Sequence, residues 1–498
     1  MLAGILGLFL VLRVPAAYLQ PGGQDEDYYA VPGLAVLESG FPRLPTLPAR
    51  NPESVFYQAD VALFAEPPLY FYWQALFYAV FPDLYGTGRL ASAVAGLAAL
   101  AALFGIGRSV TGRNDVGLMA AMLLSVSRWF YFGATTARPD QLSGTFGLLA
   151  VAALLASRHR HRERWLAVSG ICIGCGGLTH FLAITYAVPL GLWAVMNEAT
   201  WRRRGASFTR ITLPAMSVAL CWVPFIATYP EPFRKQFHNQ FVAGTGDSLL
   251  MRLVWPWEAL RFQGAGMVQH IGWPQTMLTC GALLFCWAYS WRRRQSDWLG
   301  VIGTAGLSSY LLCVCLADDH LGLGYWTVPA GLAYLCAASL PIRMAHWAGR
   351  SQWSQGMVVA VVFGGLCLAH LPGCGLRTLI VLWQHRHDVR YHAPQFAQEI
   401  MRSIPPDARC SVDAQFLLDF YVSGRPTLNL QSMPKYFLTQ EHPFDYMIVS
   451  RFGVAEKTAE LVDAELIQTL GLRDDPFACY AEIYRPRSRT QALDPKDP

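Results

Sequence analysis

The sequence carries little charge for its length. Asp, Glu, Lys and Arg make up 15% of the 498 residues, whereas hydrophobic residues make up 53%. This balance excludes an ordinary soluble enzyme. Lys and Arg occur in short, scattered clusters, and the formal net charge is only +5. Because no basic stripe is present to follow a phosphate backbone, the sequence argues against a nucleic-acid partner.

Cysteine is scarce outside the apolar runs. Most of the 12 cysteines lie inside such runs, where a free cysteine packs as a small hydrophobic residue. Cys172 and Cys175 have CxxC spacing but stand in a glycine-rich apolar segment without partner ligands, so we expect no metal or redox site there. Cys410 and Cys479 lie in a more polar tail, where a disulfide is an alternative if that tail is extracytoplasmic.

Long apolar runs, by contrast, are spread along most of the chain. A bilayer crossing needs roughly 20 apolar residues, so the runs predict a polytopic α-helical membrane protein with about 11–13 transmembrane helices. The first run starts at Met1 without a basic leader or a small-x-small cleavage site, so we expect a retained helix rather than a signal peptide. The predicted spans lie near residues 2–20, 88–107, 116–134, 141–157, 165–179, 181–197, 209–228, 273–290, 298–316, 321–340 and 355–373.

The basic loops set the predicted orientation. The positive-inside rule assigns to the cytoplasm the loops that are rich in Lys and Arg, at 108–113, 158–164, 201–205, 291–294 and 343–350. The intervening loops hold acids, aromatic residues and prolines, and we place them outside. The aromatic segment 67–82 would reverse this orientation if it crossed fully. We therefore expect it to form an interfacial helix on the outer face, with a true crossing as the alternative.

The composition changes near residue 388, where charges begin to recur every few residues and no further span follows. This change predicts a membrane domain over 1–387 and a small extracytoplasmic α/β domain over 388–498, on the same side as a first outer loop at 21–66. Within the second domain we expect helices at 395–404 and 457–471, a strand running into a helix at 410–424, and strands at 445–451 and 478–485.

The ionisable residues on the predicted outer face form a candidate site. They are Asp25, Glu26, Asp27, Glu66, Arg138, Asp140, His180, Asp318, Asp319 and His320. Because burying charge in lipid is costly, such a cluster at a membrane boundary indicates function by default. The structural alternatives are a solvated loop, which we favour for Asp27, an Arg138–Asp140 ion pair at a helix start, and a hydrogen-bonded helix contact at His180.

The order of these residues and their neighbours resembles the GT-C superfamily of polyprenyl-phosphate-sugar-dependent glycosyltransferases, particularly the protein O-mannosyltransferases and the lipid A aminoarabinose transferases. The resemblance covers most of the chain. It is carried by Asp25–Glu26 with the tyrosines that follow, Glu66-Pro67-Pro68-Leu69, Ala137-Arg138-Pro139-Asp140, Thr179-His180-Phe181, and Gly324-Tyr325 followed by Pro329.

The resemblance implies a reaction and its partners. An acidic residue of the first outer loop is the general base in that family, which implies this catalytic role for Asp25, with Glu26 beside it. A carboxylate that accepts the proton activates a sugar hydroxyl, and direct displacement inverts the anomeric carbon. Donor or phosphate contacts are implied for Arg138, Asp140, His180, Glu66, His320 and Tyr325. The implied partners are an undecaprenyl-phosphate-type sugar donor, a lipid, glycan or protein acceptor, and the lipids of a bacterial inner membrane.

The chain departs from this family at two cationic positions. The aminoarabinose transferases have an Arg soon after the acidic pair and a Lys just before the double proline, whereas this chain has Tyr28 and Glu66. Either other residues supply the missing charge, such as Arg138, His180, Arg261 or His320, or a divalent metal is held among Asp25, Glu26 and Glu66. We expect the first arrangement and no cofactor, because Arg matches phosphate oxygens with a fixed fork of donors.

Two rival classes remain open. A transporter or flippase of a lipid-linked or small substrate fits the number of helices, but transporters usually carry internal repeats and midplane binding residues. We find no convincing repeat, and the acids gather at one face. A noncatalytic scaffold of polysaccharide assembly is the third reading.

Overall fold

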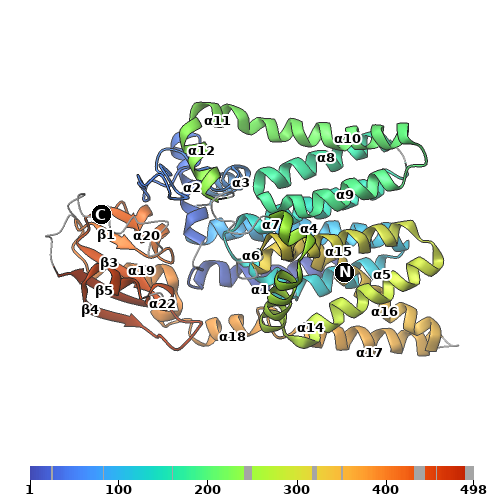
Figure 1. The fold of residues 1–498 in the computed structure, drawn as a ribbon. Helices are drawn as coiled ribbons and strands as arrows, with labels where there is room; N and C mark the ends of the chain where they lie inside the picture. Colours follow the sequence, from blue (N-terminus) through green and yellow to red (C-terminus); the bar gives the residue numbers. More distant parts are fainter. Residues whose placement is uncertain are drawn as a thin grey trace.

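The computed structural model describes residues 1–23, 26–81, 84–159, 161–240, 249–316, 322–348, 352–430, 443–455 and 457–487. A bundle of long helices makes up most of the chain, and a small α/β domain formed by the C-terminal part lies at one end of it (Figure 1). The turns between α9 and α10 and between α14 and α15 lie at the opposite end (Figure 1). These turns adjoin the basic clusters that the sequence assigns to the cytoplasm.

Helices occupy every predicted span. They are α1 (Leu2–Leu19), α4 (Leu84–Thr111), α5 (Asn114–Ser125), α6 (Arg128–Thr135), α7 (Pro139–Ala156), α8 (Arg162–Thr179), α9 (Ile184–Met196), α10 (Trp201–Ala219), α11 (Val223–Thr228), α14 (Trp257–Arg293), α15 (Ser296–Cys315), α16 (Thr327–Ala348) and α17 (Gln352–His370). Three spans are irregular: α5 and α6 are bent by 66°, α10 and α11 are joined by a 3-10 turn, and α14 is kinked at Gly272. The predicted polytopic helical fold is confirmed.

Length and composition alone identify fewer membrane spans than the 11–13 that the sequence predicts. Six of the described helices are long and apolar enough, or seven if the bent pair α5 and α6 is one span. Others fall short for visible reasons: α8 begins with the charged stretch Arg162–Arg164, and the apolar helices over 181–196 and 355–370 are short. Such segments are accommodated by packing within the bundle.

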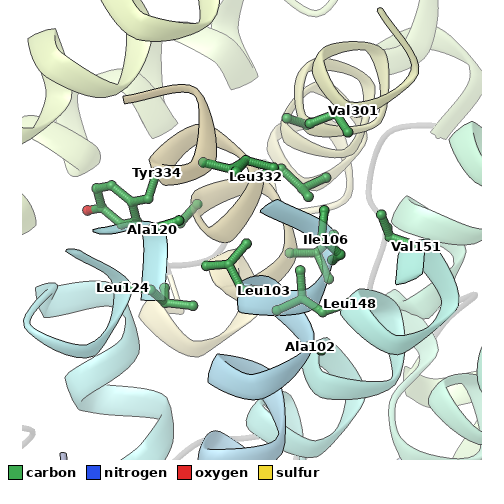
Figure 2. Packing of buried hydrophobic residues seen from close by; sticks show 14 of the residues in the cluster. Ala102, Leu103, Ile106, Ala120, Leu124, Leu148, Val151, Val301, Leu332 and Tyr334 are labelled. Carbon is green, nitrogen blue, oxygen red and sulfur yellow. The ribbon is translucent and has the colours of Figure 1, made fainter. Parts of the chain in front are cut away.

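The bundle core holds aliphatic side chains of three helices, among others. Leu103 and Ile106 of α4, Leu148 of α7 and Leu332 of α16 are buried and converge (Figure 2). Small residues bring α4 close to α5, because a Cβ on Gly107 would lie only 2.7 Å from the Cα of Gly117. Close approach at small residues is a common way to pack helices in membranes, where no hydrophobic force drives their association.

Among the described residues, four shorter helices lie between the predicted spans. They comprise α2 (Glu26–Ser39), α3 (Leu69–Tyr78), α12 (Pro230–His238) and α13 (Leu249–Val254). The aromatic segment predicted at 67–82 forms α3, which has ten residues. At 1.5 Å per residue it extends about 15 Å, half of the hydrocarbon thickness, so the described helix does not suffice for the crossing alternative. Its interfacial position remains a prediction.

The C-terminal domain holds a mixed five-stranded sheet of order β2-β1-β3-β5-β4. Its strands are β1 (Cys410–Val412), β2 (Thr427–Asn429), β3 (Tyr446–Ser450), β4 (Ala464–Gly471) and β5 (Tyr480–Pro486), and its helices are α19 (Ala393–Arg402), α20 (Leu417–Val422) and α22 (Arg451–Ala455). A short helix, α18 (Leu376–Gln384), precedes it. Strands β1, β2 and β3 run parallel, and β5 pairs antiparallel with both β3 and β4.

One prediction for this domain was wrong, and one alternative is not realised. The segment 457–471 does not form an amphipathic helix: it starts with a 3-10 turn and continues as β4, an edge strand with a bulge between Leu466 and Gln468. Pairing with β5, which a local pattern does not reveal, outweighs the local helical spacing. Cys410 and Cys479 form no disulfide, and both are buried in the domain core as free thiols.

The domain packs directly on the first outer loop. Leu417 and Leu418 of α20 are buried with Leu44 and Leu47 of that loop, and the Asn429 amide N donates to the carbonyl of Thr46 at 2.8 Å. Tyr85 of α4 is buried in the domain's own apolar core. The C-terminal domain therefore shares buried apolar contacts with the first loop and with α4.

Candidate functional site

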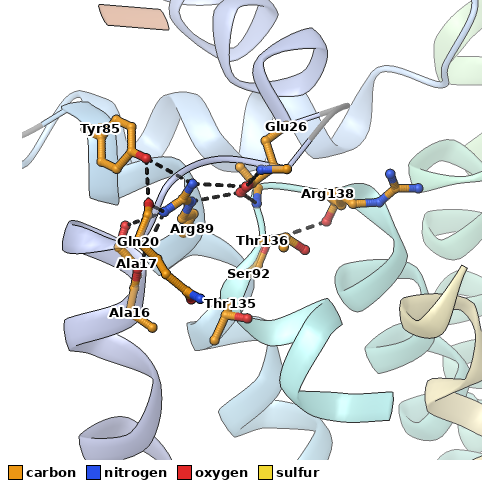
Figure 3. Close-up of polar contacts among 12 residues, drawn as sticks. Ala16, Ala17, Gln20, Glu26, Tyr85, Arg89, Ser92, Thr135, Thr136 and Arg138 are labelled. Carbon is orange, nitrogen blue, oxygen red and sulfur yellow. Dashed lines mark hydrogen bonds and ion pairs between the residues drawn. The ribbon is translucent and has the colours of Figure 1, made fainter. Parts of the chain in front are cut away.

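Glu26, one of the two predicted catalytic acids, is a buried anchor. Its Oε1 accepts from Arg89 Nε at 2.8 Å and from the Ala137 amide N at 2.7 Å, while its Oε2 accepts from Arg89 Nη2 at 3.0 Å and from the Gly23 amide N (Figure 3). Glu26 is 3% exposed and Arg89 4%. With both oxygens engaged in this way, the carboxylate is suited to fixing the loop and not to accepting a proton from a substrate.

Arg89 ties this anchor to the end of the first span. Its Nη1 donates to the carbonyls of Gln20 at 2.8 Å and Ala17 at 3.1 Å, at the C-terminal end of α1, and its Nη2 also donates to the hydroxyl of Tyr85 (Figure 3). A cation there satisfies carbonyls that a helix end leaves without partners. Sequence reasoning missed Arg89, although a lone arginine inside the apolar span 88–107 was a visible signal.

Two of the predicted site residues, Asp25 and His320, lie outside the described residues, as do Asp318 and Asp319. Their roles remain predictions. The two described neighbours of the Asp25 segment are Gly23 and Glu26, which are joined by the hydrogen bond from the Gly23 amide.

A second cluster brings together Arg138, Asp140 and Tyr325, which the sequence singled out separately. Arg138 Nε donates to Asp140 Oδ2 at 3.0 Å, and Arg138 Nη2 donates to the Tyr325 hydroxyl at 3.0 Å. Arg138 is extended because Pro139 follows it and opens α7, and this places the two charged residues on either side of the helix start. Asp140 Oδ1 is buried without a hydrogen-bond partner among the described residues.

Gly324 explains how Tyr325 reaches this cluster. A Cβ on Gly324 would lie 2.6 Å from Asp140 Oδ2, so only glycine lets this turn approach the carboxylate. This close approach gives a steric reason for a glycine directly before Tyr325.

His180 and Glu66 complete the cluster. The His180 ring packs against Tyr325 with centroids 5.0 Å apart, and its Nε2 lies 3.8 Å from Glu66 Oε2. Its Nδ1 accepts from the Leu182 amide N at 3.1 Å, so in the neutral ring Nε2 carries the proton. The pKa of His180 is lowered to about 4, chiefly by burial, with Asp140 opposing this shift and Arg138 adding to it. His180 is therefore a neutral hydrogen-bond donor at physiological pH and not the cation that the sequence suggested.

Gln236 of α12 fixes the chain just before Glu66. Its Oε1 accepts from the amides of Phe64 at 2.7 Å and Ala65 at 3.0 Å, and its Nε2 donates to the carbonyls of Tyr57 and Ala62, both at 2.8 Å. The side chain is fully buried. No local sequence pattern links residues this far apart, so sequence reasoning did not find this contact.

The described residues do not make up a metal site. No group of three His, Cys, Asp or Glu side chains with suitable spacing occurs within the described ranges, which exclude Asp25. Of the alternative metal ligands, Glu26 is committed to Arg89, and Glu66 lies beside His180. Glu26 and Glu66 by themselves bring together fewer oxygen ligands than a divalent cation takes.

Solved structures share this architecture along nearly the whole chain. ArnT from Cupriavidus metallidurans, bound to undecaprenyl phosphate, superposes with a TM-score of 0.60 at 14% identity, covering 97% of each chain. The Archaeoglobus fulgidus oligosaccharyltransferase superposes with a TM-score of 0.57 at 10% identity, covering 91% of this chain and 70% of that one. These likenesses define a GT-C membrane fold.

The sequence points to the same class. Residues 65–226 match the family described as dolichyl-phosphate-mannose-protein mannosyltransferase. No protein with a curated description matches the sequence significantly. The family match over 65–226 and the fold along the whole chain both agree with the predicted class, that of multi-pass membrane glycosyltransferases of the GT-C type.

Proposed function

We propose that the protein transfers a sugar from a polyprenyl-phosphate donor of the undecaprenyl type to a lipid, glycan or protein acceptor on the outer face of a bacterial inner membrane. The observation that carries this proposal is the convergence of Arg138, Tyr325, His180, Asp140 and Glu66 in one cluster beside the first outer loop. ArnT in the structure named above is bound to undecaprenyl phosphate, and AglB of Archaeoglobus fulgidus has been solved with a dolichol-phosphate.

The cluster's donors suit a phosphate. Arg138 offers a charged fork, the Tyr325 hydroxyl lies 3.0 Å from it, and His180 Nε2–H supplies a neutral donor. The departing polyprenyl phosphate gains negative charge as its bond to the anomeric carbon breaks, and fixed donors stabilise that charge. The buried Oδ1 of Asp140 has no hydrogen-bond partner among the described residues and can accept from a ligand, such as a sugar hydroxyl.

We assign proton transfer to Asp25 and positioning to Glu26. The Glu26–Arg89 anchor fixes the start of α2, which directly follows Asp25 in the sequence. Asp25 accepts the proton of the acceptor hydroxyl, whose oxygen bonds to the anomeric carbon with inversion while the bond to phosphate oxygen breaks. The acceptor approaches from outside the membrane, and we place the C-terminal domain on that side.

Arg138→Ala should weaken binding of undecaprenyl phosphate to the purified full-length protein by about 10- to 100-fold, since hydrogen bonds to charged groups contribute about 1.5–3 kcal/mol. Arg50→Ala is the matched control, because Arg50 is an exposed outer-loop arginine paired with Asp60 at 2.7 Å. Its affinity should stay within twofold of wild type.

The same titration in excess chelator decides whether Arg138 or a divalent metal supplies the positive charge at the phosphate. Unchanged wild-type affinity supports direct binding by Arg138, whereas affinity lost to chelation and restored by Mn²⁺ or Mg²⁺ assigns the charge to a metal. An Arg138→Ala protein with wild-type affinity would contradict the proposed donor site.

A further inference from the structure

A cavity of about 230 Å³ lies between the first outer loop and the C-terminal domain. Gly22, Glu26 and Arg89 line one side, Thr135 and Thr136 at the end of α6 line another, and the outer domain contributes Gln415 and Phe452, among other residues. The cavity therefore exists only because the outer domain is docked on the membrane bundle.

The cavity is separate from the Arg138 cluster. None of Arg138, Asp140, His180, Glu66 and Tyr325 lines it. The side chain of Arg138 points away from Arg89 and Thr135 (Figure 3). Glu26 lies between Arg89 and Arg138 and accepts from the Ala137 amide. A donor phosphate at Arg138 leaves the cavity open for a second substrate. Gly23 and Glu26, the described neighbours of the Asp25 segment, both line it.

The lining of the cavity suits a sugar ring. Aromatic rings of Tyr131, Phe132 and Phe452 can cover apolar ring faces, and the hydroxyls of Thr135 and Thr136 lie at the same cavity. Gln415 and Tyr480 of the outer domain also line the cavity, and the Tyr480 hydroxyl, which donates to Glu482 Oε1, can still accept a hydrogen bond. A sugar has several hydroxyls to use these groups, whereas a serine or threonine side chain presents only one.

The volume limits what fits. Pockets for drug-sized ligands start at about 300 Å³, so a cavity of about 230 Å³ holds a single ring and neither a lipid tail nor a folded peptide segment. The rest of a larger acceptor has to extend out of the cavity toward solvent or the membrane surface.

We propose that this cavity is the acceptor subsite, and that it takes the terminal sugar ring of a glycan or glycolipid. The proposal rests on the glycosyl transfer proposed above. The acceptor oxygen bonds to the anomeric carbon, the bond from that carbon to the phosphate oxygen breaks with its electron pair leaving on the phosphate, and the hydroxyl proton passes to Asp25. The outer domain thereby supplies part of the acceptor site.

Gly22 offers a way to fill the cavity without strain. A Cβ at this position meets Arg89 Nη2 and the Gln415 carbonyl O at 3.4 Å and Glu26 Oε2 at 3.7 Å, which are ordinary contacts. The series Gly22→Ala, Gly22→Val and Gly22→Leu should progressively occupy the cavity. Gly205→Leu is the control, because a Cβ on this α10 glycine meets no atom within 4 Å.

The assay uses the lipid-linked sugars of a strain lacking the gene as donor, with octyl glycosides or a serine- and threonine-containing peptide as acceptors. Gly22→Leu should raise the KM for the octyl glycoside at least tenfold, with smaller increases for Val and Ala. Its melting temperature and its affinity for undecaprenyl phosphate should match wild type, and Gly205→Leu should change nothing. Thr136→Val, which removes one hydroxyl at nearly constant volume, should raise the same KM severalfold.

The outcomes discriminate. A normally folded Gly22→Leu protein with unchanged KM overturns the subsite. If Gly22→Leu instead weakens binding of undecaprenyl phosphate, the cavity belongs to the donor. Transfer to the peptide alone overturns the sugar-ring acceptor. A wild-type protein that binds undecaprenyl phosphate but transfers to neither acceptor also overturns the subsite. A wild-type protein that neither binds the lipid phosphate nor transfers any sugar overturns the proposed function itself.

Discussion

Asp25→Asn should lower turnover by roughly a hundredfold or more while binding of undecaprenyl phosphate stays at the wild-type level. General-base removal has this scale, because asparagine keeps the shape of the side chain but cannot accept the proton in the transition state. The measurement is single-turnover transfer by the purified protein, with donor binding titrated in parallel. Asp27→Asn, which alters an acid that we expect to be solvated, is the control and should keep near-normal rates.

The alternative assignment within the same site is Glu66, which lies beside His180. An Asp25→Asn protein with near-normal turnover would move the base to Glu66, since Glu26 is engaged by Arg89 and two backbone amides. Glu66→Gln measured in the same assay would then show the hundredfold loss.

Arg89→Ala should destabilise the protein by about 3–5 kcal/mol, the usual cost of leaving one partner of a buried ion pair uncompensated. Glu26 would keep its charge at 3% exposure without the bidentate partner, and the carbonyls at the end of α1 would lose their donor. Thermal unfolding of the purified protein gives the stability, and limited proteolysis of residues 20–40 reports on the start of α2.

A double substitution separates the contribution of the ion pair to stability from that of the surrounding contacts. Glu26→Gln combined with Arg89→Met removes both charges, so it should unfold at a higher temperature than Arg89→Met alone. If Arg89→Ala unfolds like wild type and leaves turnover unchanged, the anchor does not position the first loop.

Hydropathy predicted the helices of the membrane part well because it is a local property, and each predicted span holds a helix. Basic turns lie at the end of the bundle opposite the C-terminal domain (Figure 1), and the orientation that they assign stays a prediction. The strand at 464–471 was read as a helix because its pairing with β5 is not visible in its own spacing.

The sequence grouped residues that the structure brings together, but it did not predict their contacts. Motif order brought Arg138, Asp140 and Tyr325 into one list, and the structure shows that they are hydrogen-bonded. The sequence did not reveal that Arg89 neutralises Glu26, since the two are 63 positions apart. It also did not reveal that burial leaves His180 uncharged, because burial depends on the whole packed environment.

The central claim is that sugar moves from a polyprenyl phosphate to an acceptor, and membranes of a strain lacking the gene test it most directly. Such membranes hold both the accumulated lipid-linked sugar and its acceptor. On adding purified wild-type protein, mass spectrometry should detect the released undecaprenyl phosphate together with an equal amount of newly glycosylated acceptor, and Asp25→Asn should release neither. Movement of the lipid-linked sugar across the membrane with no new glycosidic bond would contradict the account and identify a flippase.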